Sequence, residues 1–377
     1  MIRDGAALVL LLPVALVGLF TCIVPALTAP TLQFGVRIPP QRVQAPVIRQ
    51  QRRAYFWRTG LLAVVITAAA AFVPAGSAWL TGALILLLLA AGLGCYFLAR
   101  ERIIAVKEAE DWYGGLRQTI AADTAWRTDP EQFPVVWLLP ALAVIAATVV
   151  VGVVRYPQLP DQLPVHFTVD GTVDRYAAKS VLTAFALVLT QVFVTALIAG
   201  LLLATYRSRP EVDAADAVAS TQRYRRFLSA MGRGLLVLAA LVDLTLMLVA
   251  FEIWRVFPPS SAATAQATVP VVVGIIVIAA IGVRMGQAGS RLRGRAEPAP
   301  ARELAVRPSA PGTTVNRDDD RFWVGGLFYV NRQDPAVVVS RRFGVGWTLN
   351  FGNPWAWVAV AVIAAAVVAL TVVVGHR

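Results

Sequence analysis

The sequence predicts an all-α polytopic membrane protein with about eight transmembrane helices, a short extracytoplasmic hairpin loop and a small C-terminal cytoplasmic module of aromatic and β character. Three observations predict this fold class. Of the 377 residues, 58% are hydrophobic and only 15% are charged, whereas soluble domains carry about a quarter charged residues. The apolar residues come in nearly uncharged blocks of about 18 to 25, long enough to cross a bilayer. The basic residues concentrate in alternate segments between these blocks.

The eight predicted spans are apolar blocks separated by polar or Pro-rich segments. In chain order they cover residues 5–27, 58–74, 79–99, 135–154, 181–206, 234–254, 269–283 and 355–375. A tight turn at 75–78 joins the second and third spans. The seventh reaches spanning length only if Met285 and nearby small residues are included. The first apolar run is longer than the core of a signal peptide, so we expect it to be retained.

The distribution of basic residues predicts in which direction each span crosses the membrane. The segments between spans 1 and 2, 3 and 4, 5 and 6, and 7 and 8, with Arg58 at the start of span 2 counted in the first, hold 28 of the 34 basic residues, and the other segments hold 6. Since basic loops remain in the cytoplasm, we expect a multi-pass protein of the cell membrane with both termini extracytoplasmic. The lipid bilayer is its expected partner. The net charge of +12 flanks membrane segments and implies no direct nucleic-acid partner.

Composition divides the chain into six regions. They are an N-terminal membrane region (1–134), a unit of two spans and a motif loop (135–206), a second membrane region (207–288), a flexible linker (289–317), a cytoplasmic aromatic and Gly-rich module (318–354) and the last span (355–377). After span 3 we expect a helix through residues 101–120, either a solvated connector or one with apolar side chains against the membrane surface. Those side chains are Ile103, Ile104, Trp112, Leu116 and Ile120.

The loop between spans 4 and 5 carries the clearest local pattern. Three prolines make its first half extended. Apolar and polar residues then alternate over 165–170, and Asp170-Gly171 is a strong two-residue hairpin turn. Such a turn pairs His166 with Arg175. We therefore expect a small ordered hairpin, held close to the membrane by both flanking spans.

Six residues of this loop are candidate ligand-binding residues. They are His166, Asp170, Gly171, Asp174, Arg175 and Lys179. Three of them, His166, Asp170 and Asp174, have the spacing of metal ligands on one helix face, but the prolines and the Asp-Gly turn argue against a helix here. A catalytic zinc ion needs three well-placed protein ligands, so we expect no metal site.

Signatures of catalysis are absent from the sequence. It contains no Ser-His-Asp, Cys-His, His-Glu-x-x-His or phosphate-cradling Gly-Lys-Ser/Thr pattern. Cys22 and Cys95 both lie within predicted spans and form neither a metal-ligand spacing nor a disulfide framework. We therefore expect no catalytic residues, no cofactor and no enzymatic activity.

The segment before the last span changes abruptly to aromatic, glycine and β-branched residues. Asp334-Pro335 marks a turn before a strand-like stretch at 337–339. We expect a compact module pinned against the last span at the headgroup level, where Trp and Tyr settle. Its candidate residues are Trp323, Tyr329, Asn331, Asp334, Arg342, Gly344, Trp347 and Asn350.

Asp243 lies near the middle of span 6, where a carboxylate is costly and faces a partner or a cavity. Gln191 lies at a similar depth in span 5. Two interpretations remain open. Asp243 is either protonated in an interhelical hydrogen bond worth about 1 kcal/mol, or part of a proton or ligand site within the bundle.

The motif loop resembles domain of unknown function 1648, which is found in SdpI-type membrane proteins. The shared pattern starts at Tyr156 with aromatic-Pro-x-Leu-Pro, continues with Pro-Val-His-Phe and a turn glycine, and closes with Asp-Arg-aromatic and Lys179. The module, from Trp323-x-Gly-Gly to Asn350, resembles domain of unknown function 5808. The early stretch at 34–39 also resembles these proteins.

The resemblance implies a non-enzymatic membrane protein. The best-described branch of these proteins confers immunity to a secreted peptide toxin and is linked to transcriptional signalling, and this chain differs from it by extra spans and a cytoplasmic module. We therefore expect the hairpin to sense, or give immunity to, an extracytoplasmic peptide or small ligand, and the module to relay to a cytoplasmic regulator. The alternative is a small proton-coupled transporter that uses Asp243.

Overall fold

The computed structural model describes residues 5–73, 77–113, 120–122, 131–167, 173–208, 211–213, 217–256, 263–292, 317 and 319–375. Helices dominate it. They are α1 (Gly5–Leu27), α2 (Pro46–Ala70), α3 (Ala78–Ala109), α5 (Leu139–Arg155), α6 (Val181–Ala184), α7 (Ala186–Arg207), α8 (Ala217–Ile253), α9 (Ala263–Met285) and α10 (Pro354–Gly375). Short 3₁₀ turns are η1 (Pro40–Arg42), η2 (Val135–Leu138), η3 (Tyr156–Gln158), η5 (Gln287–Gly289) and η6 (Asp320–Phe322).

The strands form antiparallel pairs. They are β1 (Leu32–Gln33) with β2 (Val36–Arg37), β3 (Ile120–Ala122) with β6 (Glu211–Asp213), β4 (Gln162–Phe167) with β5 (Val173–Ala178), β7 (Trp323–Val324) with β8 (Phe328–Tyr329), and β9 (Val338–Ser340) with β10 (Trp347–Leu349). The last two pairs lie in the segment where the sequence predicts a small β module.

Each predicted span lies at least partly within a helix, because a helix satisfies its own backbone hydrogen bonds in lipid. Within the described residues, five helical segments are long and apolar enough to cross a membrane. They are Trp79–Ala109, Val135–Gln158, Ala186–Arg207, Ala219–Ile253 and Gln266–Gly289. Pro13–Leu27 within α1 and Pro354–Ala369 within α10 are shorter apolar stretches. The protein is a multi-pass membrane protein, and eight crossings stay a prediction.

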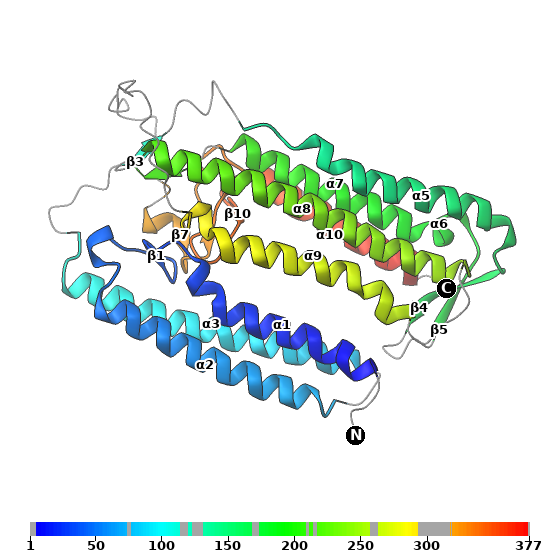
Figure 1. The fold of residues 1–377 in the computed structure, drawn as a ribbon, viewed down its shortest axis with the longest axis horizontal. Coiled ribbons are helices and arrows are strands. Elements are labelled where there is room, and N and C mark those ends of the chain that lie inside the picture. Colours follow the sequence, from blue (N-terminus) through cyan, green and yellow to red (C-terminus); the bar gives the residue numbers. More distant parts are fainter. Residues whose placement is uncertain are drawn as a thin grey trace.

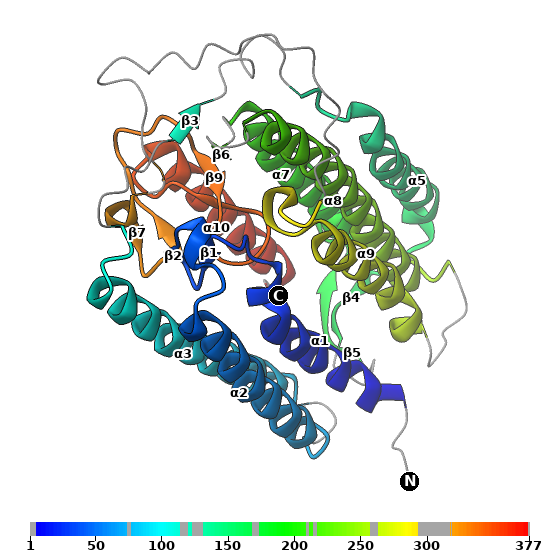
Figure 2. The ribbon, with the colours of Figure 1, turned by 60° about the vertical axis from the view of Figure 1, so that its left-hand side comes forward.

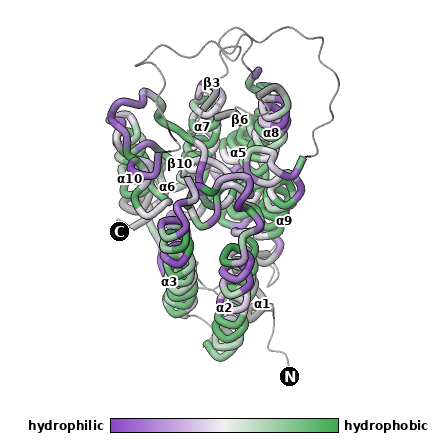
Figure 3. The backbone as a smooth tube through the Cα atoms, turned by 90° about the vertical axis from the view of Figure 1, so that its left-hand side faces the viewer, coloured by the Kyte–Doolittle hydropathy of each residue, from purple (hydrophilic) through white to green (hydrophobic). Residues whose placement is uncertain are grey.

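The helices form two groups that run roughly parallel (Figures 1 and 2). In the first group α1, α2 and α3 pack together around Val14, Ile66 and Leu88. In the second, α8 packs against α5, α7 and α9, and α10 lies beside α7. Hydrophobic residues follow the helices over most of their length, whereas hydrophilic segments gather at the end where β10 lies (Figure 3). Both ends of the described chain lie at the other end, near β4 and β5 (Figure 1).

The helix of the third span continues past residue 99 as expected, but it does not extend to residue 120. Helix α3 ends at Ala109, and Asp111 has a left-handed φ of 41° that turns the chain. Ile103 and Trp112 are buried in a cluster with residues from the α1–α2 connection and do not lie on the membrane surface. Ile104 packs at the edge of the same cluster, and Ile120 belongs to β3. The sequence missed this because the partners of these side chains are distant in the chain.

The hairpin between α5 and α7 is present, with one correction to its register. His166 pairs with Arg175 as predicted, but Leu163 pairs with Ala177 and Phe167 with Val173, so the register shifts by one residue on each side of His166. Such a shift is a β-bulge, which one uniform two-residue turn cannot produce. The turn itself and most of the predicted linker lie outside the described residues.

Candidate functional site

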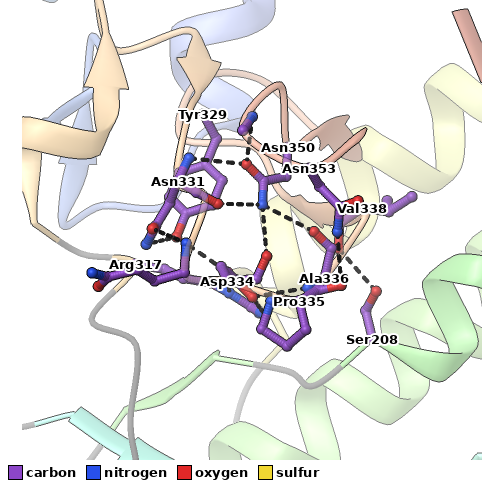
Figure 4. Close-up of polar contacts among 12 residues, drawn as sticks. Ser208, Arg317, Tyr329, Asn331, Asp334, Pro335, Ala336, Val338, Asn350 and Asn353 are labelled. Carbon is purple, nitrogen blue, oxygen red and sulfur yellow. Dashed lines mark hydrogen bonds and ion pairs between the residues drawn. The ribbon is translucent and has the colours of Figure 1, made fainter. Parts of the chain in front are cut away.

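The C-terminal module (residues 319–353) is built around the buried side chain of Asn350. Its amide nitrogen donates to the carbonyl oxygens of Asn331 (2.9 Å), Asp334 (3.0 Å) and Ala336 (3.1 Å). Its amide oxygen accepts from the backbone nitrogens of Asn331 and Gly352, each at 3.0 Å. Figure 4 shows these bonds converging on one side chain. One side-chain amide thus provides hydrogen-bond partners for backbone groups of two loops. These loops have no regular β-ladder that could provide those partners.

Asp334 is the charged centre of the same module. Its carboxylate accepts hydrogen bonds from Arg317 (Nη2 to Oδ1, 3.0 Å), the Tyr329 hydroxyl (3.1 Å) and the Ala336 amide (3.0 Å). Burial opposes ionisation, but Arg317 and these bonds outweigh it and hold the pKa of Asp334 below its ordinary value. Burial raises the pKa of the Tyr329 hydroxyl. Trp323 fixes Arg317 in turn, because its indole nitrogen donates to the Arg317 carbonyl oxygen at 2.7 Å.

Charged side chains join the module to the first helix group. Lys107 Nζ of α3 lies 2.9 Å from Asp320 Oδ2, and Arg342 bonds the other carboxylate oxygen of Asp320. Burial opposes ionisation of Asp320, but Arg342 and Lys107 outweigh it and lower its pKa. The Gly344 amide donates to the hydroxyl of Thr28, which follows α1, at 2.9 Å. Both α1 and α3 are therefore bonded to the module.

The β1–β2 turn meets the module backbone to backbone. Phe34 and Gly35 both have positive φ, 49° and 69°, as a type I′ turn requires. A Cβ atom on Gly35 would lie 2.7 Å from the carbonyl oxygen of Gly326, so only glycine fits. The same part of the module is also bonded to α3, because the Tyr96 hydroxyl donates to the Gly325 carbonyl oxygen at 2.9 Å. The stretch at 34–39 and the module thus form one interface.

The second helix group binds the opposite edge of the module. Gln287, which follows α9, donates to the Gly346 carbonyl oxygen at 3.0 Å and accepts from the Gly346 amide at 2.7 Å. The Ser208 hydroxyl, at the end of α7, donates to the Val338 carbonyl oxygen at 2.9 Å. The module therefore bridges both helix groups, in addition to preceding the last helix as the sequence predicts.

The β4–β5 hairpin lies at the other end of the helices (Figure 1). Lys179 fixes its base, since the Lys179 amide donates to the Asp161 carbonyl oxygen at 2.7 Å and its Nζ donates to the Leu159 carbonyl oxygen at 2.9 Å. Ser180 then forms a capping box with Thr183 and starts the helical turn that leads into α7. The hairpin is thereby continuous with α7.

The candidate residues of the hairpin are only partly brought together. The structure places the backbones of His166 and Arg175 opposite each other, with the Arg175 side chain exposed and Lys179 half-buried. The backbone of Asp174 lies in β5, and Asp170 and Gly171 lie outside the described residues. In the described part of the chain, no group of three His, Cys, Asp or Glu residues could hold a metal ion.

A polar cluster around Asp243, the Asp243 cluster, joins the three helices α5, α7 and α8. Gln191 Nε2 donates to the Asp243 carbonyl oxygen at 2.7 Å and to Thr148 Oγ1 at 3.1 Å, and Thr195 Oγ1 donates to Asp243 Oδ2 at 2.7 Å. Gln191 therefore bonds the backbone of Asp243, whereas the Asp243 carboxylate bonds Thr195. Within the described structure, Gln191 Oε1 and Asp243 Oδ1 are buried without a hydrogen-bond partner.

Several partners were not singled out from the sequence. They are Lys107, Thr148, Thr195, Ser208, Gln287, Arg317 and Asp320. The run of aspartates at 318–320, close to several arginines, was a usable signal for the ion pairs. Ser208 and Gln287 carried no such signal, since polar residues at helix ends are ordinary. Trp347 was singled out, and its indole nitrogen lies 3.4 Å from the Tyr224 hydroxyl of α8.

Comparison with known proteins finds two family matches. Residues 143–192 match the model of a domain of unknown function, DUF1648, and residues 332–357 match that of a family of unknown function, DUF5808. Neither the comparison with curated proteins nor that with solved structures found a match. The first match covers parts of α5 and α7 with the hairpin between them, and the second covers much of the module. The chain thus carries both domains that its sequence resembles, in the expected order.

Proposed function

We propose that this protein is a membrane sensor or immunity protein whose β4–β5 hairpin binds an extracytoplasmic peptide or small ligand and whose module relays that binding to a cytoplasmic regulator. One observation carries the proposal. Two helices, α7 and α10, each run from the hairpin to the module. The resemblance of the motif loop to SdpI-type proteins supports a peptide as the ligand.

Helix α7 is fixed at both ends. At one end, the base of the hairpin leads into α7 through the Ser180 capping box. At the other end of α7, the Ser208 hydroxyl donates a hydrogen bond to the module. Helix α10 provides a second link. It begins next to Asn353, whose side chain accepts from the Trp355 amide at 3.0 Å and donates to the Pro335 carbonyl oxygen at 2.9 Å. It then contacts α7, α6 and β4.

The Asp243 cluster limits how α7 and α8 can move. Gln191 and Thr195 attach α7 to Asp243 of α8 by two buried hydrogen bonds. A ligand that displaces the hairpin must therefore move α7 and α8 together or break those bonds. The first response moves both Ser208 and Tyr224, which contact the module, and the second moves Ser208 without Tyr224.

Cells that lack the gene, or that express a variant at an exposed residue of the hairpin, test the proposal. We expect deletion of the gene, and the Arg175→Glu variant, to change sensitivity to a panel of defined membrane-active peptides or the expression of neighbouring genes. The matched control is Arg102→Glu, which reverses an equally exposed charge on α3. The proposal fails if deletion alters neither peptide sensitivity nor expression.

A second candidate function is proton-coupled transport through Asp243. It is favoured by a fully buried carboxylate with one oxygen, Oδ1, that lacks a hydrogen-bond partner within the described structure. In proteoliposomes, Asp243→Asn should abolish proton-coupled flux, whereas Glu252→Gln on the same helix should not. Unaltered flux in Asp243→Asn would rule out this function.

A further inference from the structure

An arginine-rich cavity of about 340 Å³ lies where the first half of α8 faces the segment before α5. It is lined by Glu131, Arg225, Arg226, Ser229, Ala230 and Arg233. Arg226, Ser229 and Arg233 follow one another at intervals of three and four residues, so they share one face of the helix. Neither the hairpin nor the module contributes to this lining.

The positive charges that line the cavity outnumber the negative ones. Glu131 lies 3.7 Å from Arg225 and partly neutralises it. Arg226 and Arg233 are exposed and form no ion pair with any described residue. Three arginines against one glutamate leave a net charge of +2 beside a serine hydroxyl. Such a lining suits an anion with several acceptor oxygens, of which phosphate is the obvious class.

The cavity lies where the membrane-facing surface begins. Four residues after Glu131, exposed apolar side chains start on η2 and continue into α5, with Val135 63% and Val136 71% exposed. Trp137 is also exposed among them, as an aromatic residue at a membrane interface would be. On α8, an apolar run over residues 234–242 follows Arg233. A phosphate in the cavity therefore has an apolar surface beside it that can accept acyl chains.

We infer that this cavity is a binding site for the phosphate group of an anionic membrane phospholipid. Arg226 and Arg233 supply the charge and Ser229 a hydroxyl donor, while the exposed face of η2 and α5 lies against the lipid's acyl chains. The net charge selects anionic over zwitterionic headgroups. Because the cavity is continuous with the apolar surface of η2 and α5, it favours a lipid over a free phosphate ion.

Native mass spectrometry of the detergent-solubilised full chain tests the site. The probes are phosphatidylglycerol, phosphatidylcholine and inorganic phosphate. The wild-type protein should bind phosphatidylglycerol in preference to phosphatidylcholine, and inorganic phosphate should not displace it. In Arg226→Gln/Arg233→Gln we expect phosphatidylglycerol affinity to fall about tenfold. Arg226→Lys/Arg233→Lys keeps the charge and should retain part of the affinity.

The matched control is Arg102→Gln/Arg332→Gln, which removes two exposed arginines at other positions and should leave binding unchanged. Equal loss in the control would show general charge attraction and overturn the site. Equal binding of both lipids by the wild-type protein would overturn it without any variant, even if a variant failed to fold. Binding of inorganic phosphate in competition with the lipid would identify a free-anion site instead.

Discussion

Asn350 shows how single residues organise the module. Its fully buried amide makes hydrogen bonds to both loops around it and leaves the Asn331 and Gly352 amides satisfied. The aromatic residues nearby supply apolar contact, but they do not pair with these backbone groups. Asn350 therefore determines the geometry of the loop that leads into β9, the strand to which the end of α7 is bonded.

We expect Asn350→Ala to lower the free energy of unfolding by about 1 to 3 kcal/mol, because it leaves several buried polar groups without partners. Urea titration in detergent, followed by tryptophan fluorescence, measures the change. Gln333→Ala is the matched control, since its side chain is exposed in the same loop. Equal stability of Asn350→Ala and the wild-type protein would show that the amide network does not hold the module.

Asp320 and Asp334 give the module a defined pH dependence. Both have a pKa below the ordinary value in the folded protein. Their contribution to stability is therefore fully present above the unfolded pKa, about 3.9, and is lost as the pH falls through the folded values. We expect the module to be insensitive to pH between neutrality and about pH 4 and to loosen below it.

An acid titration of tryptophan emission checks this dependence. Asp320→Asn lacks the ion pairs with Lys107 and Arg342 at every pH. It should begin less stable at neutral pH and lose less on acidification than the wild-type protein. Identical titration curves for the two proteins would contradict the role given to Asp320.

At the scale of elements, the turn between β1 and β2 decides how the first helix group meets the module. Its backbone touches that of Gly326 so closely that no side chain fits at Gly35. The sequence resemblance at 34–39 therefore reflects a turn that serves as an interface. Phe34 and Ile38, beside the turn, are buried in a cluster with side chains of α2 and α3, and Leu327 and Phe343 of the module pack against that cluster.

We expect Gly35→Ala to open this interface, because the added methyl group meets the Gly326 carbonyl oxygen and the residue needs a positive φ. Limited proteolysis should cut the module faster than in the wild-type protein. Gly94→Ala in α3 is the control, because nothing lies within 4 Å of its Cβ and the helix favours alanine. Equal cleavage of Gly35→Ala and Gly94→Ala would argue against the interface.

Sequence patterns predicted some elements well and others poorly, for a physical reason. Spans, the hairpin and the strand after Asp334-Pro335 follow from apolar length, alternation and turn residues, all of which are local. The end of α3 and the hairpin bulge depend on packing partners elsewhere. Contacts such as Lys107 with Asp320, or Thr28 with Gly344, join residues more than 200 positions apart and leave no local pattern.

At the scale of the whole molecule, the hairpin and the module lie at opposite ends of one set of helices, and the module bridges two helix groups. In the proposed function, α7 and α10 are the links through which one end responds to the other. The distribution of basic residues predicts that the module lies on the cytoplasmic side and the hairpin outside. The proposed function depends on that sidedness more than on any single residue.

Cysteine accessibility in intact cells tests the sidedness most directly. In a background lacking Cys22 and Cys95, single cysteines at Asp161, in the exposed base of the hairpin, and at Arg332, exposed on the module, report the two ends. We predict that a membrane-impermeant thiol reagent labels Asp161→Cys in intact cells and Arg332→Cys only after permeabilisation. Labelling of Arg332→Cys in intact cells, with Asp161→Cys protected, would contradict the proposed orientation and with it the sensing function.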